Sequence, residues 1–442
     1  MKMEKEDLKQ RTLSVIDDKA QEIIEIGQDI FAHPELGYKE FRTSEIVAGA
    51  LEKLGLPVRK GLAITGVAAR LDGRSEGPNV CVMGELDAVV CPGHPYADKV
   101  SGAAHACGHN GQVAGMLGAA MGLVLSGAAE HLSGSVTFLG VPAEEYVELE
   151  YRQKLREEGK IQFFGGKQEL LAKGFFDDVD MAMMVHMGSM GDKCKVSMGG
   201  TSNGFIGKLI RYKGVEAHAG AAPDLGVNAL NAALLGLMSI HVQRETFKDE
   251  DHIRVHPIIT KGGDLVNVIP ADVRMETYVR GRTMEAIKSA SAKVNRALRA
   301  GALATGAEVT IEELPGYLPR INCDELTEVC RANAVSLVGE GMVQEGKHGS
   351  GSSDIGDHMH VMPAIHPTCA GAQGAAHSER FSIENPVDAY ILPAKLMALT
   401  VVDLLWDNAA RARSVLKNFK PVFSKEQYFA NWNEVLASPG ER

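Results

Sequence analysis

The sequence predicts an α/β protein in which a doubly wound main domain is interrupted by an inserted α+β domain of ferredoxin-like order. Apolar, strand-like runs alternate with helical patterns in the first part of the chain. A βαββαβ succession follows, and the first pattern then returns. The expected boundaries are 1–198 for the first part of the main domain, 199–314 for the inserted domain and 315–442 for the second part.

Composition limits the classes of function. A chain of 442 residues is too long for one ordinary core, so two or three domain-sized units are expected. The net charge of -11 argues against nucleic acid or an anionic membrane as a partner. Seven cysteines without a CxxC pair indicate a reducing compartment, and the amino terminus lacks the apolar core of a secretory signal. The longest apolar run, Val113 to Leu125, is shorter than the roughly 20 residues of a membrane span. We therefore expect a cytoplasmic protein.

The elements of the main domain follow from apolar periodicity. Helices are expected at 6–31, 40–54, 112–125, 325–337 and 389–405. Strands are expected at 66–71, 79–86, 135–141, 181–185 and 361–365. Asn110 stands before the third helix as a plausible N-cap.

Three of these strands end on acidic or imidazole side chains. Asp87 follows one strand, Glu144 and Glu145 follow another, and His186 follows a third. Ligands gather outside the carboxyl ends of strands in open α/β sheets, so we expect these four side chains to converge. Each also has a plain structural interpretation, as a turn former, a solvated helix start or an edge histidine. Their shared placement favours convergence.

The segment 105–110 combines two imidazoles, a thiol and a glycine hinge in six residues. Cys107 and His109 are two residues apart, so in an extended backbone their side chains project to the same side. A single cation could bind both. The alternative is a buried thiol beside two ordinary histidines. A further histidine, His377, lies in the small-residue segment 374–379.

The inserted domain has the order of a split βαβ unit with one helical face. Its expected strands are 204–212, 253–260, 273–279 and 308–312, and its expected helices are 227–242 and 284–303. One edge strand would stay open, and pairing with a second copy is a natural way to cover it. Before this domain, the stretch 146–174 resembles a surface helix followed by a flap, and its pattern favours plain surface.

Thiolate, imidazole and carboxylate groups together suit Zn²⁺, Mn²⁺ or Co²⁺ and do not suit Ca²⁺. The candidate ligands are Cys107, His109, Glu145, His186 and His377. Five ligands exceed one tetrahedral shell, so two divalent transition metal ions are expected, and a water between them would lose a proton near neutral pH. Glu144, next to a ligand carboxylate, is the candidate general base and later general acid.

The chain resembles the aminoacylase/carboxypeptidase family of dinuclear metallohydrolases, and within it the branch of indole-acetyl-amino-acid hydrolases and aminobenzoyl-glutamate hydrolases. The resemblance rests on His186 and on seven motifs in family order: HPELGYKE (33–40), ELDA (85–88), HACGHN (105–110), PAEE (142–145), EAHAGAAPDLGVNAL (216–230), GGDLVNVIPADV (262–273) and AAHSE (375–379).

This resemblance implies a catalytic domain interrupted by a lid that also forms a homodimer. It implies the five ligands given above, with Glu144 as base and Asp87 as the acid that orients a ligand. It further implies that His218 reaches the neighbouring subunit's site and stabilises the oxyanion, an effect on the order of 3 kcal/mol. Asn267 and Arg280 match positions that hold the substrate's amide and carboxylate.

Two departures bear on the substrate. Many relatives of this branch have Asp where this chain has Asn110, and aminobenzoyl-glutamate-type and β-alanyl-dipeptidase-type members share the Asn. The stretch 146–165 is also longer than usual, which affects the shape of the substrate pocket.

The leading hypothesis is hydrolysis of the amide between an acyl or aroyl group and an amino acid, as in an N-acyl amino acid or an aminobenzoyl-glutamate-like compound. The alternative is a dipeptidase or carboxypeptidase that cleaves small peptides such as β-alanyl dipeptides. A different class is a thiol hydrolase that uses Cys107 with His105 or His109, and a chelator would not abolish its activity. A binding protein without turnover is a third class, which the presence of both Glu144 and His218 disfavours.

Overall fold

The computed structural model describes residues 3–437, and the chain divides into two compact units. Unit 1 comprises the chain up to Gly200, Ile321–Lys347 and Asp357–Val422, and unit 2 comprises Thr201–Arg320, His348–Gly356 and the chain from Phe423. The sequence placed the boundaries of the inserted domain at 199 and 314, so unit 2 includes two further segments. One joins it because Gly349 forms a β-bridge with Ser202. The other joins it because α12 (Lys425–Ala437), for which the sequence offered no expectation, packs against β14 (Glu308–Pro315).

The central sheet of unit 1 is mixed. Its six strands, in spatial order, are β1 (Val58–Leu62), β2 (Gly66–Asp72), β6 (Ser133–Val141), β3 (Ser75–Glu85), β7 (Met181–Met183) and β16 (Ala364–Ile365). The pairs β6/β3, β3/β7 and β7/β16 are parallel, as expected for an α/β sheet. The pairs β1/β2 and β2/β6 are antiparallel. A short turn joins β1 to β2, and a short turn permits only antiparallel pairing, so the doubly wound expectation does not describe this edge.

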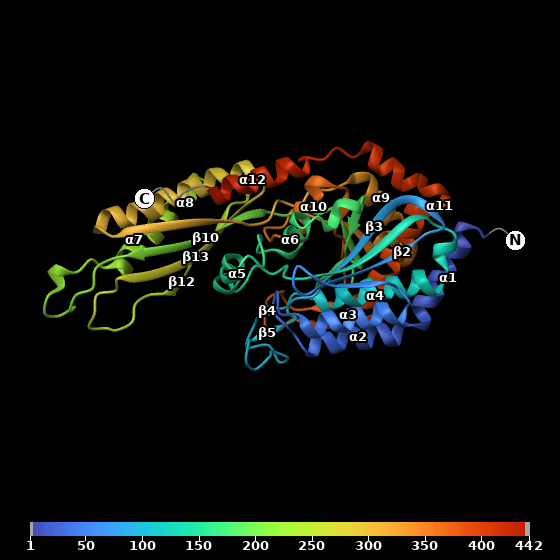
Figure 1. Ribbon diagram of the computed structural model, residues 1–442, viewed down its shortest axis with the longest axis horizontal. Coiled ribbons are helices and arrows are strands. Elements are labelled where there is room, and N and C mark those ends of the chain that lie inside the picture. The colour runs from blue at the N-terminus through green and yellow to red at the C-terminus, as the bar shows by residue number, and fades with distance from the viewer. Residues whose placement is uncertain (1–2, 438–442) are drawn as a thin grey trace. The chain divides into compact units, whose positions relative to one another are not determined.

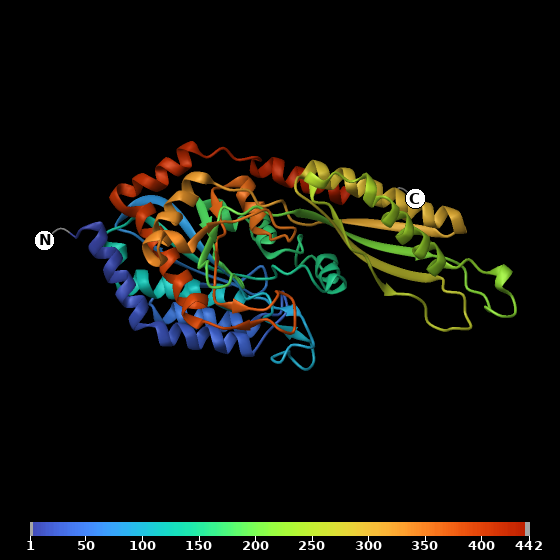
Figure 2. The ribbon, with the colours of Figure 1, turned by 180° about the vertical axis from the view of Figure 1, so that it is seen from behind.

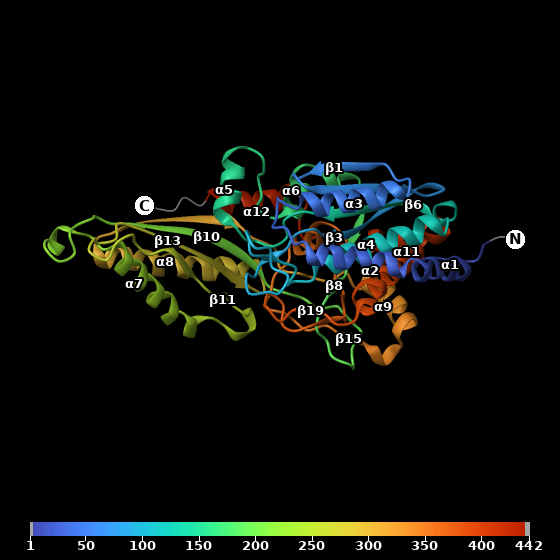
Figure 3. The ribbon, with the colours of Figure 1, turned by 90° about the horizontal axis from the view of Figure 1, so that it is seen from below.

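Unit 1 also contains α-helices, several of which pack against this sheet. They are α1 (Lys5–Asp18), α2 (Ala20–Ala32), α3 (Phe41–Lys53), α4 (His109–Leu125), α5 (Leu149–Glu157), α6 (Gly166–Ala172), α9 (Asp324–Val338), α10 (Ile355–Val361) and α11 (Leu392–Asn418). The helix expected at 6–31 is two helices, because Lys19 departs from helical dihedrals. Val80, Val82, Val136 and Phe138 of β3 and β6 share one hydrophobic core with residues of α1, α2, α4 and α11. Figures 1 and 3 show α2, α3 and α4 side by side.

The longest apolar helical stretch belongs to this core. Within residues 3–437, Val387–Asn418 is long and apolar enough to cross a membrane by length and composition, and 83% of its most apolar window is buried in the protein. It consists of a π-helical turn η7 (Val387–Ile391) and α11, which contacts α1, α4 and α9 (Figure 2). Burial among these helices is typical of the core helix of a globular unit.

Short strands lie near the carboxyl ends of β3, β6 and β7. A four-stranded sheet has the order β15 (Val343–Glu345), β9 (Val196–Met198), β17 (Thr368–Cys369) and β8 (His186–Met187). Two hairpins pair β4 (Val89–Val90) with β5 (Ala103–Ala104) and β18 (Ala372–Gln373) with β19 (Ser382–Ile383). β4, β5, β8, β18 and β19 carry or flank the motif residues of unit 1, and the brevity of these strands explains why periodicity in the sequence did not reveal them.

The stretch 146–174 is not plain surface. Arg152 of α5 is fully buried, and so is Lys167 of α6. Phe163 and Phe164 between these helices are also buried. The guanidinium group of Arg152 donates to the backbone oxygens of Glu145 and Phe164, which holds the stretch against the PAEE motif. The surface prediction was wrong because the charge of Arg152 is satisfied internally.

Unit 2 has an antiparallel sheet with two helices packed on it. Its elements are β10 (Gly204–Lys213), α7 (Ala229–Val242), β11 (Arg254–Val255), β12 (Ile258–Lys261), β13 (Asp272–Gly281), α8 (Met284–Thr305) and β14. This succession agrees with the expected βαββαβ order, except that the second strand is broken into β11 and β12. The helices α7 and α8 pack against each other and share one hydrophobic core with the sheet (Figure 3).

Candidate metal centre

A left-handed glycine brings the thiol and one imidazole to the start of α4. Gly108 has a φ of 91°, and a Cβ at this position would lie 2.7 Å from Cγ of Met187. Only glycine adopts this conformation readily in so little space. Gly108 is also the N-cap of α4, so the expectation that Asn110 caps the helix was wrong. The Asn110 amide instead donates to Tyr390 Oη at 3.0 Å and to the backbone oxygen of Gly27 at 3.1 Å.

The structure brings all five candidate ligands together. Cys107, His109 and His186 form one group and Cys107, Glu145 and His377 another, and within each group one donor atom per residue lies within 4.8 Å of the others. Cys107 belongs to both groups. The Cys107 Sγ lies 3.6 Å from His186 Nε2, and His377 Nε2 lies 3.1 Å from Glu145 Oε1. The thiol therefore lies between two pairs of donors that come from distant parts of the chain.

These distances fit metal coordination. Two ligand atoms bound to one tetrahedral Zn²⁺ at its usual bond lengths lie roughly 3.3–3.6 Å apart. The two separations, 3.6 Å and 3.1 Å, are close to this range. The donors combine one sulfur, three imidazole nitrogens and a carboxylate, which is the chemistry that borderline transition metals prefer. The residues present therefore fit a pair of divalent ions that share Cys107.

Further contacts orient two of the imidazoles. His109 Nδ1 lies 2.9 Å from the backbone oxygen of Asp87 and 3.2 Å from its Oδ1. His186 Nδ1 lies 2.6 Å from the backbone oxygen of Met187. A proton held on Nδ1 by these acceptors leaves Nε2 of each ring unprotonated, which is the form that binds a cation.

Asp87 connects the imidazole to the carboxylate motif. This residue is fully buried, and its Oδ2 accepts a hydrogen bond of 2.8 Å from the backbone N–H of Glu145. Burial alone would raise the pKa of Asp87, but hydrogen bonding and attraction to His109 outweigh burial and lower it. Asp87 thus stays ionised and holds two candidate ligands at once.

The candidate base lies on the same side of His109 as a second carboxylate. Glu144 and Glu85 form a third donor group with His109, and His109 Nε2 lies 3.8 Å from Glu144 Oε2 and 3.0 Å from Glu85 Oε2. Glu85 is fully buried, and it pairs with Lys167 Nζ at 2.5 Å and with Gln112 Nε2 at 2.6 Å. The sequence did not single out Glu85. Its place in the ELDA motif, two residues before Asp87, could have indicated a role for Glu85. Its partner Lys167 could not be inferred, because that residue is 82 positions away in the sequence.

The thiol chemistry favours a ligand over a nucleophile. Burial would raise the pKa of the Cys107 thiol, yet attraction to His109 and hydrogen bonds from His109, His186 and His377 lower it well below its usual value. The resulting thiolate faces three imidazoles, which suits a bridging ligand. His105 is buried, its pKa is lowered by burial to about 3, and neither ring nitrogen has a hydrogen-bond partner among residues 3–437. It therefore does not pair with Cys107, and the thiol-hydrolase alternative would have to use His109 as the partner of the thiol.

The three remaining candidates lie in unit 2. His218 is exposed, and its Nδ1 accepts hydrogen bonds from the backbone N–H groups of Gly220 and Ala221. Asn267 is exposed, and its backbone oxygen accepts from Ala219 N–H at 2.9 Å, so the two motifs are adjacent.

Arg280 lies on β13 and is oriented by several neighbours. Its guanidinium carbon lies 5.4 Å from the ring centres of both Phe205 and Tyr278. Its Nη1 donates to Ser352 Oγ at 3.0 Å, and its Nε donates to His256 Nε2 at 3.3 Å. The two aromatic rings and these two hydrogen bonds hold the guanidinium group in one orientation.

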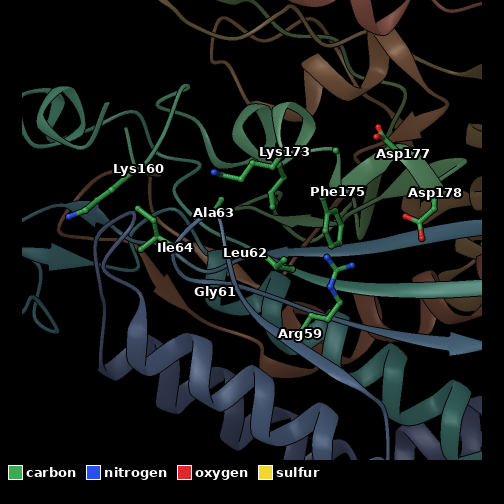
Figure 4. Close-up of a pocket in the computed structure, with 12 residues that line it drawn as sticks. Arg59, Gly61, Leu62, Ala63, Ile64, Lys160, Lys173, Phe175, Asp177 and Asp178 are labelled. Atoms are coloured by element: carbon green, nitrogen blue, oxygen red, sulfur yellow. The ribbon is translucent and has the colours of Figure 1, made fainter. Parts of the chain in front are cut away.

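A groove of about 690 Å³ in unit 1 is separate from this centre (Figure 4). Its walls are the turn between β1 and β2 and the segment around α6 and the 3₁₀ helix η2 (Phe175–Asp178). The Arg59 guanidinium carbon lies 5.6 Å from the centre of the Phe175 ring at one end of the groove. None of the five donors lines it, so the groove is not the metal centre.

Comparison with known proteins identifies the class. Residues 81–401 match the family model of Peptidase family M20/M25/M40. This match covers more than half of the chain, so the chain belongs to that family and is a metallohydrolase of the M20 type. The family resemblance inferred from the motifs is therefore confirmed.

Individual relatives place the chain within the family. It is 30% identical to the Xaa-Arg dipeptidase of Mus musculus, covering 95% of this chain and 94% of the relative. It is 27% identical to an IAA-amino acid hydrolase of Arabidopsis thaliana, covering 88% and 86% of the two chains. A structure of an aminobenzoyl-glutamate utilization protein from Klebsiella pneumoniae superposes with a TM-score of 0.67 at 19% identity, covering 89% of this chain and 98% of that chain. This last likeness shows the fold.

Proposed function

We propose that this chain hydrolyses the amide that joins an acyl or aroyl group to an amino acid, with two divalent transition metal ions (Zn²⁺, Mn²⁺ or Co²⁺) held by Cys107, His109, Glu145, His186 and His377. The observation that carries the proposal is the thiol of Cys107, which is shared by two donor groups beside Glu144. Family membership supports hydrolysis as the class of reaction.

The ions, when bound, supply Lewis acidity that polarises the amide carbonyl and lowers the pKa of water. Glu144 accepts the proton of the attacking water and delivers it to the leaving amide nitrogen. Its carboxylate lies 3.8 Å from His109 Nε2, which places the proton acceptor beside the ligand cluster. Asp87 keeps His109 and the backbone of Glu145 in position during this transfer.

We assign the residues of unit 2 to substrate binding. Arg280 would bind the carboxylate of the released amino acid, Asn267 would bind the amide region, and His218 would stabilise the oxyanion in the site of a second copy. The exposed position of His218 supports a role outside its own unit. A homodimer through unit 2, acting as a lid, is supported by exposed apolar residues on α7 (Leu234, Leu235, Met238, Val242) and on the edge strand β12 (Ile258, Ile259).

Dipeptidase activity is the second candidate. The observation that favours it is the relative of 30% identity over 95% of the chain, whose name is Xaa-Arg dipeptidase. Small dipeptides, β-alanyl dipeptides among them, contain the same linear amide next to a free carboxylate. The two candidates therefore require the same ligand cluster and differ in the group that precedes the amide.

A substrate panel tests the proposal. The purified chain is stripped of metal with a chelator, reloaded with Zn²⁺, Mn²⁺ or Co²⁺, and assayed with N-acyl amino acids, aminobenzoyl-glutamate, β-alanyl dipeptides and Xaa-Arg dipeptides. We expect activity only after reloading and only with amides that precede a free carboxylate. Full activity in the metal-free chain would contradict the proposal, and activity on dipeptides alone would establish the second candidate.

We further propose a cytoplasmic location. All seven cysteines are free, and the six other than Cys107 are buried, as in proteins of reducing compartments.

A further inference from the structure

The residue before the candidate base has a rare backbone conformation. Ala143 has a φ of 52°, in the left-handed region that residues with a Cβ seldom occupy. Conformations of this kind persist only where surrounding contacts hold them, and they cluster at functional sites. Because Glu144 follows directly, the dihedrals of Ala143 set the direction in which the Glu144 side chain leaves the loop.

Both backbone groups of Ala143 are held by neighbours. Its N–H donates to Glu40 Oε1 at 2.7 Å, and its carbonyl accepts from the N–H of Gly166 at 3.1 Å. The N–H of Glu145, two residues on, donates to Asp87. Asp87 therefore holds the backbone of Glu145, which follows Glu144, and Glu40 holds the backbone of Ala143, which precedes it.

Glu40 has no counter-charge. It is fully buried, and no lysine, arginine or histidine pairs with it in the described part of the chain. Its Oε2 lies 2.5 Å from Thr65 Oγ1, and its Oε1 faces the N–H of Ala143. An unpaired buried carboxylate is costly, whereas a protonated carboxyl group can accept from Ala143 and donate to Thr65. Burial and the negative charge of Asp87 raise the pKa of Glu40 to about 8, which agrees with the neutral form.

The partner of Glu40 follows a second unusual turn. Ala63 and Ile64, directly before Thr65, have φ angles of 46° and 77°. These two residues line the groove of Figure 4, and the opposite wall includes α6, which begins at Gly166. Both walls of the groove are thus connected to Ala143. One wall is connected through Thr65 and Glu40 to the N–H of Ala143, and the other is connected through Gly166 to its carbonyl.

We infer that Glu40 is a positioning residue for the general base: as a neutral carboxyl group it connects the Thr65 turn to the Ala143 peptide and thereby aims Glu144 at the reacting water. This inference rests on the proposed function, because it assigns to Glu144 the role of base. It predicts that the position requires the shape and hydrogen bonds of a carboxyl group and does not require its charge.

Matched substitutions test the inference. Glu40→Gln has the shape and hydrogen-bonding pattern of a protonated glutamic acid, and Glu40→Leu has a similar size without polar atoms. We expect E40Q to keep kcat near the wild-type value and E40L to lower kcat on the order of 10- to 100-fold, with metal content and KM little changed. Glu52→Gln on the exposed face of α3 is the control for the loss of a surface charge.

Several outcomes would overturn the inference. Equal losses in E40Q and E40L would mean that the charge of Glu40 is needed, and an unchanged kcat in E40L would mean that Glu40 does not position the base. Loss of metal together with kcat in E40L would indicate a purely structural role. If E40L does not fold, Thr65→Val replaces it and should lower kcat, with Thr65→Ser near wild type, and an unchanged T65V would overturn the inference as well.

A measurement without substrate separates this inference from the proposed function. Hydrogen exchange of the peptide that contains residues 142–147 should be faster in E40L than in the wild-type chain and unchanged in E40Q. If no amide is hydrolysed by the wild-type chain, the proposed function fails, whereas the exchange result still decides whether Glu40 holds the loop. Equal exchange in all three chains would refute the positioning role.

Discussion

The candidate carboxylates of unit 1 are buried, whereas His218 and Asn267 of unit 2 are exposed, as is His377 of unit 1 at 53%. In unit 1, Asp87 and His109 are almost completely buried and are held by several further contacts. In unit 2, His218 and Asn267 are exposed and contact mainly their own loops. A metal site needs ligands in fixed positions, and all five candidate ligands lie in unit 1. Residues that meet a substrate or a second chain must stay accessible until that partner arrives.

The largest effect should come from the base of unit 1. Glu144→Gln removes the proton acceptor without changing the ligands, so kcat should fall by about 10²- to 10⁴-fold while the metal content stays unchanged. Steady-state kinetics and elemental analysis of the purified variant measure both quantities. Glu157→Gln on the exposed face of α5 is a control that should keep wild-type kinetics. Near-normal turnover in E144Q would remove Glu144 from the mechanism.

His218 tests the exposed side of the comparison. His218→Ala should lower kcat by about 100-fold if the imidazole stabilises the oxyanion, and it should not change metal content or thermal stability, because the side chain is exposed. The two inactive variants H218A and E144Q can then be mixed after reversible dissociation. Recovery of activity in the mixture would show that His218 acts in the partner's site. A mixture that stays inactive would place His218 in its own chain's site or outside the mechanism.

Each unit contains a buried lysine paired with a glutamate, which offers a matched pair of substitutions. Lys167 pairs with Glu85 beside His109, and Lys208 pairs with Glu313 in the sheet of unit 2. Lys167→Met and Lys208→Met each remove the lysine partner of a glutamate, so each should lower the free energy of unfolding by about 3–5 kcal/mol. Only K167M should also lower metal affinity, since Glu85 contacts His109. Chemical denaturation and metal titration measure these quantities. Equal metal affinity in both variants would show that Glu85 does not affect metal binding.

The smallest effect on stability is expected on α7. Met238 and Leu235 are 61% and 43% exposed, and replacing both by lysine should change the free energy of unfolding of the isolated chain by only about 0.5 kcal/mol. If α7 forms the dimer contact, the double variant should be monomeric by light scattering. A variant that keeps the wild-type mass would move the contact to another surface.

Much of the fold follows from apolar periodicity, which is a local property. The helix at Phe41–Lys53 and the strand at Ser133–Val141 agree with their predicted positions. The prediction failed at Asn110 and Arg152, where a polar residue looked like a cap or a surface group but is satisfied by distant partners. Periodicity cannot reveal such partners, because they are adjacent only after folding.

The sequence by itself determined the class of ligands, since the thiol, imidazole and carboxylate donors follow strand ends and lie in family motifs. Only the tertiary structure decided which atoms face one another: Cys107 between two donor groups, Glu85 between Lys167 and His109, and Glu40 under the peptide before Glu144. Residue types and spacing are encoded locally. The distance between two side chains far apart in sequence depends on how the sheet and helices pack, and this packing is a property of the whole folded unit.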